Sequence, residues 1–173
     1  MKSMVMNMSP WQRWLRNLTA TPFLARRHFP PTVLQAIEAA VTHAEARHAG
    51  EIRFVVEAAL DIPALLAGQT PRERALEVFS ALRVWDTAHN NGVLIYLLLA
   101  EHDVEIIVDR GLAARVSTEE WERVCHEMEA EFRAGRFREG AVTGIEGVAS
   151  LLGRFFPHDG GDRNEQPNRP ILL

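Results

Sequence analysis

Six polar residues stand at the ends of apolar segments of this chain, and their types could do chemistry: Glu51, Asp86, Asn90, Asn91, Asp109 and Arg110. Carboxylate and amide oxygens are the ligands that Ca²⁺ and Mg²⁺ prefer in proteins. We therefore take Asp86, Asn91 and Asp109 as candidate ligands of a Ca²⁺ or Mg²⁺ cofactor. Arg110 beside them could hold a phosphate group, with the cation neutralising the remaining charge.

Each of these residues also has an ordinary structural role open to it. Residues 90–92 (NNG) are a common turn sequence, because Asn and Gly tolerate a positive φ. Asp109 could cap a short helix that follows it, and Glu51 could pair with Arg53. Spacing alone does not decide between a binding site and these structural roles.

The segments that must position the candidate residues have clear periodicities. Residues 51–57 (EIRFVVE) predict a strand, with Ile, Phe and Val on one face and all three charged residues, together with a second Val, on the other. The near-continuous apolar run 92–100 predicts a strand that is covered on both faces. Residues 104–108 resume the strand pattern after a short polar break, so the two runs are predicted to form a hairpin.

Helical periodicity accounts for most of the remaining central sequence. One helix is predicted to begin near Pro31 and to end before Gly50. Thr70 and Ser117 each precede a Glu by three residues, which is the capping-box pattern, and each should open a further helix. A last helix is predicted over residues 140–156.

The order of these elements predicts an α/β fold, a three-layer α/β/α sandwich with a small mixed β-sheet. The first two strands should be parallel and joined by a right-handed β–α–β crossover, with the hairpin adding an antiparallel strand. Parallel strands begin at the same edge of a sheet, so Glu51 and Asn91 should meet there. The hairpin returns the chain to that edge with Asp109 and Arg110. One end of the sheet is therefore the candidate site.

Composition divides the chain into three parts. Residues 1–30 form a basic amphipathic arm, and residues 31–156 form the periodic α/β domain. Residues 157–173 are rich in Pro, Gly and Asn and are predicted to be a disordered tail.

The arm carries a second candidate surface. Residues 1–31 contain five Lys or Arg and no Asp or Glu. Trp11 and Trp14 share one face of a predicted helix, whereas Arg13 and Arg16 lie towards the other. Such a segment could make a peripheral contact with an anionic membrane or dock a protein partner. The alternative is that it packs against its own domain.

Overall composition excludes several classes of protein. The formal net charge of −4 gives no indication of nucleic-acid binding. Cys125 is the single cysteine, which excludes an intrachain disulfide framework and fits a reducing compartment. The first residues contain no apolar stretch of signal-peptide length and no run of about 18 apolar residues occurs in the sequence, so we expect a cytoplasmic protein.

Several segments, taken in order, resemble a known family. Residues 85–92 (WDTAHNNG), the strand VLIYLLLA, the segment VEIIVDRGL and the later FRAGRFREGAVTGIEGV are similar to the TPM domain over roughly residues 31–156. The resemblance implies an α/β/α fold. It also implies two activities, because plant members are described as acid phosphatases with a role in photosystem repair and some members bind Ca²⁺.

Two functions are therefore expected. The first is a non-catalytic module that binds a cation or a partner and supports the assembly or maintenance of envelope-associated proteins. The alternative is a weak, metal-assisted acid phosphatase acting on phosphate monoesters, with Arg110 holding phosphate and Glu51 as a base. The first is preferred, because no nucleophile or recognised acid–base pair can be named.

Overall fold

The computed structural model describes residues 9–158 and 164–173, and their centre is a four-stranded sheet in the order β3-β2-β1-β4. β1 (Glu51–Glu57) pairs in parallel with β2 (Gly92–Leu98), and β2 pairs antiparallel with β3 (Asp103–Val108). The short β4 (Ile171–Leu172) lies parallel to β1 on its outer side. The predicted β–α–β crossover and hairpin are confirmed.

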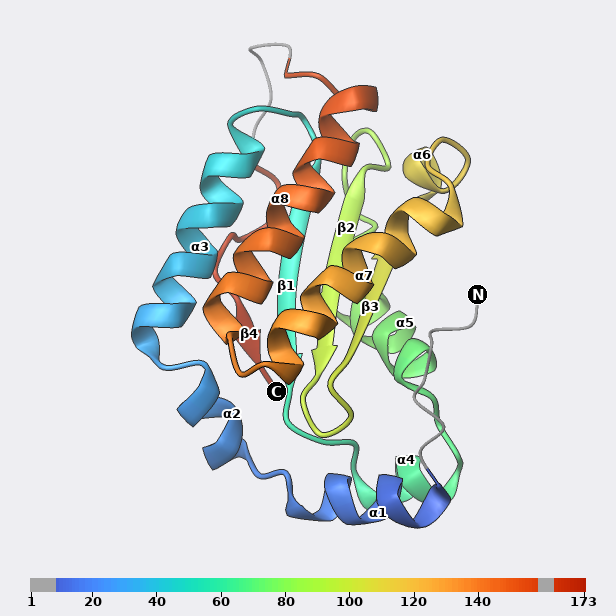
Figure 1. Cartoon of the computed structure of the whole chain (residues 1–173). Coiled ribbons are helices and arrows are strands. Elements are labelled where there is room, and N and C mark those ends of the chain that lie inside the picture. Colours follow the sequence, from blue (N-terminus) through green and yellow to red (C-terminus); the bar gives the residue numbers. More distant parts are fainter. Residues whose placement is uncertain (1–8, 159–163) are drawn as a thin grey trace.

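Helices cover both faces of this sheet (Figure 1). α3 (Pro31–Glu45), α7 (Thr118–Arg133) and α8 (Phe137–Phe155) pack on one face. α5 (Pro71–Ala81) packs on the other, after the short α4 (Ile62–Leu66). The three-layer α/β/α sandwich predicted from the sequence is confirmed.

Three further helices lie at the ends of the sheet. α6 (Arg110–Ala113) follows β3 directly. α1 (Pro10–Thr19) and α2 (Pro22–His28) lie at the opposite end, with α1 below the β2–β3 hairpin in Figure 1 and α2 to its left. Among the described residues, no helix has both the length and the apolar character needed to cross a membrane.

Local sequence explains where the main helices begin. Thr70 accepts the backbone N–H of Glu73, whose side chain accepts the N–H of Thr70, and Ser117 forms the same reciprocal pair with Glu120. Both predicted capping boxes are therefore present. Each one satisfies backbone N–H groups that a helix start would otherwise leave without partners.

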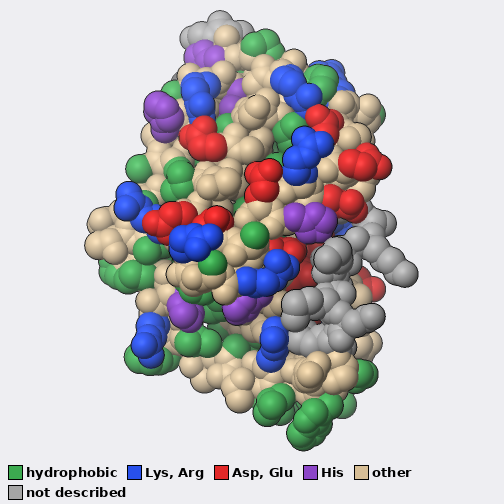
Figure 2. All heavy atoms as spheres, in the orientation of Figure 1, with side chains coloured by type: hydrophobic (Ala, Val, Ile, Leu, Met, Phe, Trp, Pro, Cys, Tyr) green, Lys and Arg blue, Asp and Glu red, His purple; other side chains and the backbone are tan. Residues whose placement is uncertain are grey.

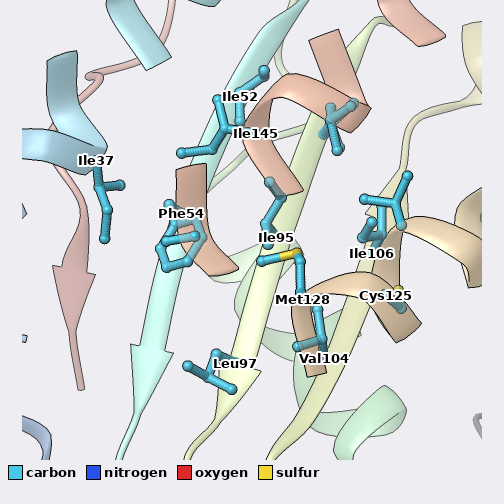
Figure 3. Close-up of a cluster of buried hydrophobic side chains, with 14 of the residues drawn as sticks. Ile37, Ile52, Phe54, Ile95, Leu97, Val104, Ile106, Cys125, Met128 and Ile145 are labelled. Carbon is cyan, nitrogen blue, oxygen red and sulfur yellow. The ribbon is translucent and has the colours of Figure 1, made fainter. Parts of the chain in front are cut away.

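Two apolar clusters, one on each side of the sheet, hold the layers together. Phe54, Ile95 and Met128 belong to the larger cluster, between the sheet and α3, α7 and α8 (Figure 3). A Cβ at Gly144 would collide with Met128, so the absence of a side chain there allows α7 and α8 to approach closely. The smaller cluster faces α5 and includes Tyr96.

The prediction about the tail is wrong, and β1 is more deeply buried than the alternation of its residues indicates. Every residue of β1 is buried, including its charged residues, so this strand has no solvated face. The tail predicted to be disordered over 157–173 is ordered over 164–173, where Ile171 and Leu172 form β4. The physical reason is that β1 would otherwise be an edge strand, and its free backbone groups offer the tail a partner that composition does not reveal.

Candidate functional site

Backbone hydrogen bonds bring three predicted site segments together at one end of the sheet. The N–H of Glu51 donates to the carbonyl of Asn91 at 3.4 Å, and the N–H of Asp109 donates to the carbonyl of Gly92 at 3.0 Å. The N–H of Gly111 donates to the carbonyl of Asn90 at 2.9 Å. The starts of β1 and β2 and the end of β3 are thus joined directly, as the parallel register requires.

The turn before β2 is held in an unusual backbone conformation. Asn90 has a φ of +51°, a value that asparagine tolerates better than most residues. Its side-chain oxygen accepts a hydrogen bond from Arg110 Nη2 at 2.9 Å. A Cβ at Gly111 would collide with the carbonyl of Asn90, so a glycine is needed for this close approach. The Arg110 side chain is otherwise exposed, so this hydrogen bond stabilises the turn from the protein surface.

Two of the predicted ligands, Asn91 and Asp109, each have a buried oxygen with no hydrogen-bond partner among the described residues. The Asn91 side chain is 1% exposed; its Nδ2 donates to the carbonyl of Ala49, while its Oδ1 has no donor. The Asp109 side chain caps α6 by accepting the N–H of Arg110 at 2.6 Å through Oδ1, while its Oδ2 has no donor. A buried oxygen without a donor costs free energy, so each is a candidate ligand for a cation.

Asp86 is not brought into this group. Its carboxylate forms a surface ion pair with Arg83 at 2.7 Å, and about half of its side chain is exposed. Among the residues that the structure describes, no cluster of three or more His, Cys, Asp or Glu could hold a metal ion. A cation here would therefore rely on Asn91 and Asp109 together with backbone or water oxygens.

Glu51 anchors the C-terminal segment. Its buried carboxylate accepts the backbone N–H groups of Glu165 and Gln166, each at 3.0 Å. In return, the Glu165 carboxylate accepts the N–H of Ala88 in the loop before β2, at 3.0 Å. Residues 164–168 therefore form a latch, which ties this end of the sheet to the loop that carries the candidate site.

The roles of three charged or titratable residues around the latch were not predicted from the sequence. Arg53 is buried and donates to the carbonyl of Pro167. Glu45 accepts the N–H of Ile52 at 2.9 Å, and burial raises the pKa of its carboxyl group to about 8. His48 accepts the N–H of Gly50 at 3.2 Å, and burial lowers the pKa of its imidazole to about 4.

A small cavity of about 220 Å³ lies between α3 and the latch. Its lining includes Glu45, Glu51, Asn164 and Asn168. The charged residues inside β1 were the signal that could have revealed this region, because a central strand buries such residues only with partners. The partners of Glu51 and Arg53 are more than a hundred positions away, in a segment without periodicity.

The opposite end of the sheet carries a different polar cluster. Arg74 reaches both carboxylate oxygens of Glu57 at 2.9 Å, and the Tyr96 hydroxyl donates to the same carboxylate at 2.6 Å. Burial, followed by the charge of Glu57, raises the pKa of Tyr96. Both oxygens of Glu57 are satisfied, so this cluster leaves no ligand atom free.

Comparisons with known proteins identify the family. A model of the TPM domain matches residues 27–151, well over half of the chain. The chain belongs to the TPM domain family. The candidate residues Asn91 and Asp109 lie inside the TPM domain match, whereas the latch and most of the arm lie outside it.

Solved structures agree with this TPM domain assignment. The BA42 protein from the psychrophilic bacterium Bizionia argentinensis, solved by NMR, is 31% identical, with a TM-score of 0.73; the match covers 82% of this chain and 93% of BA42. The N-terminal domain of a protein from P. gingivalis is 23% identical, with a TM-score of 0.56 over 72% of this chain and 76% of that one, and supports the fold alone. None of the curated proteins searched matches the chain.

Proposed function

We propose that this TPM domain is a non-catalytic module that binds a divalent cation, Ca²⁺ or Mg²⁺, at the end of the sheet where β2 begins and β3 ends. The observation that carries the proposal is the pair of buried oxygens without donors, Asn91 Oδ1 just before β2 and Asp109 Oδ2 just after β3. One is an amide oxygen and the other a carboxylate oxygen, which are ligands that hard cations prefer.

The ligand set also indicates how tightly the cation would bind. Two protein side chains carry a single formal negative charge, so most of the coordination shell would be water or backbone carbonyl. Sites with few charged ligands bind Ca²⁺ weakly, with a dissociation constant on the order of 10⁻⁴–10⁻³ M. We therefore propose a site that fills only where the cation is abundant, supporting the assembly or maintenance of envelope-associated proteins by presenting the cation to a protein partner.

The acid phosphatase alternative has less support from the geometry. Glu51, the residue considered as a base, uses its carboxylate to hold two backbone N–H groups of the latch. Arg110, considered as the phosphate ligand, is hydrogen-bonded to Asn90. The binding module is therefore the function that we propose.

Isothermal titration calorimetry with Ca²⁺ and with Mg²⁺ tests the proposal. The wild-type chain should bind one cation, and Asp109→Asn should abolish the heat of binding because it removes the charged ligand. Asp86→Asn is the matched control, since it removes a carboxylate from the neighbouring loop that pairs with Arg83 instead. Equal binding by wild type and Asp109→Asn would refute the site.

A further inference from the structure

α1 is attached to the domain by polar side chains. Arg13 donates to the carboxylate of Glu101 at 2.8 Å and to the carbonyl of Gln69 at 2.5 Å. Asn17 is 4% exposed, and its side chain accepts the N–H of Leu60 at 2.9 Å while donating to Glu101 at 3.0 Å. An amphipathic helix on a globular domain normally buries its apolar stripe, so this orientation is inverted.

The apolar stripe of α1 is exposed as a result. Trp11, Leu15 and Leu18 follow the helical repeat and are 73%, 50% and 58% exposed, although Trp14 at the edge of the stripe packs against the smaller apolar cluster. In the next helix, Phe23 is 74% exposed. The expectation that the arm packs against its own domain thus holds for its polar side and fails for most of its apolar side.

The neighbouring α4 enlarges this apolar surface. α1 is hydrogen-bonded to residues on both sides of α4, and α4 exposes Ile62 and Leu66, by 54% and 73%. Figure 2 shows hydrophobic side chains gathered at the lower end of the molecule, where α1 lies in Figure 1, with Lys or Arg side chains at the same end. An exposed apolar surface of this kind marks a contact with another molecule or with a membrane.

Charge indicates which kind of contact this is. Arg16, Arg26 and Arg27 are exposed on α1 and α2, and none of the three forms an ion pair within the described ranges. Residues 1–31 contain no Asp or Glu, although the whole chain is acidic at −4. An exposed apolar stripe next to unpaired arginines is complementary to a bilayer that has anionic headgroups above an apolar interior.

We propose that α1 and α2, with the exposed face of α4, form a docking surface for an anionic lipid membrane. The side chains of Trp11, Leu15, Leu18 and Phe23 would enter the boundary between headgroups and acyl chains, while the arginines contact the headgroups. Arg13 and Asn17 fix α1 to the domain, so the stripe is already oriented for the membrane. The candidate cation site lies at the other end of the sheet and would face away from the lipid (Figure 1).

Co-sedimentation of the full chain with vesicles tests this surface. Vesicles of phosphatidylcholine with about one third phosphatidylglycerol should pellet the wild-type chain, and pure phosphatidylcholine should pellet far less. Trp11→Ser with Leu15→Ser should weaken binding at least tenfold, because each side chain contributes burial worth roughly a factor of ten. Arg26→Gln with Arg27→Gln should weaken binding to anionic vesicles roughly tenfold or more.

Trp85→Ser is the matched control. Trp85 is also exposed, at 46%, but it lies in the loop at the other end of the molecule, so this variant should pellet like wild type. Because Trp11 and Leu15 are exposed in the folded chain, their substitution should leave the melting temperature unchanged. Equal pelleting of wild type and Trp11→Ser with Leu15→Ser, or no pelleting of wild type, would overturn the proposal.

Sedimentation velocity without lipid separates the membrane from another copy of the chain. A monomer at all concentrations is the expected result. A dimer that Trp11→Ser with Leu15→Ser abolishes would show that the stripe pairs with a second chain, and would overturn the membrane assignment.

Discussion

The two ends of the sheet both carry buried charged residues, but they satisfy those residues differently. Where β1 and β2 end, Glu57, Arg74 and Tyr96 form a closed network in which each carboxylate oxygen has a donor. Where the same strands begin, Asn91 and Asp109 each keep one buried oxygen without a donor. The Glu57 network and the Asn91–Asp109 pair therefore differ in how completely their oxygens are hydrogen-bonded, and not simply in the number of charged residues.

The same comparison separates stability from binding. At the closed end, the ion pair between Arg74 and Glu57 matters for stability, because its loss would leave the buried carboxylate of Glu57 without a cationic partner. The end where β1 and β2 begin is the open end. It relies on backbone pairing and on the latch, so substitutions of its side chains should lower the free energy of unfolding less. Variants at the closed end should therefore lower stability most, and variants at the open end should affect the latch, the pH dependence and the binding of cations.

The largest expected effect is at the closed end. Arg74→Ala removes the donor to both oxygens of Glu57, so a largely buried carboxylate is left with Tyr96 alone. We predict a loss of about 3 kcal/mol in the free energy of unfolding, measured by urea denaturation. Arg83→Ala is the control, since Arg83 pairs with Asp86 on the surface and should cost less than about 0.5 kcal/mol. Equal losses in the two variants would contradict the comparison.

A smaller loss is expected when the latch is loosened. Glu51→Gln keeps the shape of the side chain but replaces one carboxylate oxygen with an NH2 group, which cannot accept the backbone N–H of Glu165 or Gln166 that it then faces. The free energy of unfolding should fall by about 2 kcal/mol. Hydrogen exchange should become faster at these two amides and at Leu173, whose N–H donates to the carbonyl of Val56 beside β4. Unchanged exchange at Leu173 would show that β4 holds without the latch.

Two groups at the open end make stability depend on pH in opposite directions. The pKa of Glu45 rises from 4.5 to about 8, so the folded chain binds the extra proton between these values. The contribution of Glu45 to the free energy of unfolding is complete below about pH 4.5 and is lost as the pH rises through 8. The pKa of His48 falls from 6.5 to about 4, so its contribution is complete above about pH 6.5 and is lost as the pH falls through 4.

Single substitutions should reduce each decline in the plot of the free energy of unfolding against pH, the upper one above pH 6.5 and the acid one below it. Between about pH 6.5 and 8, Glu45→Gln should flatten the decline in the free energy of unfolding that wild type shows. Between about pH 6.5 and 4, His48→Gln should reduce the decline by roughly 1–2 kcal/mol, with part of the acid limb remaining from other groups. Thermal denaturation in a series of buffers measures both. Parallel profiles for wild type and Glu45→Gln would contradict the assignment of the upper limb.

The sequence was sufficient to predict the order of the elements and the meeting of three segments at one edge. Capping boxes and strand periodicity are local signals, and a parallel β–α–β unit leaves little freedom in where Glu51 and Asn91 lie. The same register brings Asp109 back beside Gly92. The part of the candidate site that depends on backbone topology could therefore be predicted.

The details that depend on distant side chains could not be predicted. Glu51 finds its partners 114 and 115 positions later, in a Pro- and Asn-rich tail whose composition indicates disorder. Asp86 lies close in sequence to the candidate turn, yet its carboxylate forms an ion pair with Arg83, three residues earlier. α1 has a clear apolar stripe, but whether the domain binds that stripe or the polar side depends on Glu101 and on the backbone around Leu60.

An NMR titration of the ¹⁵N-labelled chain with Ca²⁺ compares the two ends of the sheet in one measurement. We predict that the amide signals of Asn90, Asn91 and Asp109 shift together and saturate, while those of Asp61, Glu73 and Glu77 in the acidic cleft beside the closed network stay in place. Shifts in the acidic cleft alone, or no shift at Asn91 and Asp109 up to about 10 mM Ca²⁺, would contradict the proposal that unsatisfied oxygens mark the cation site.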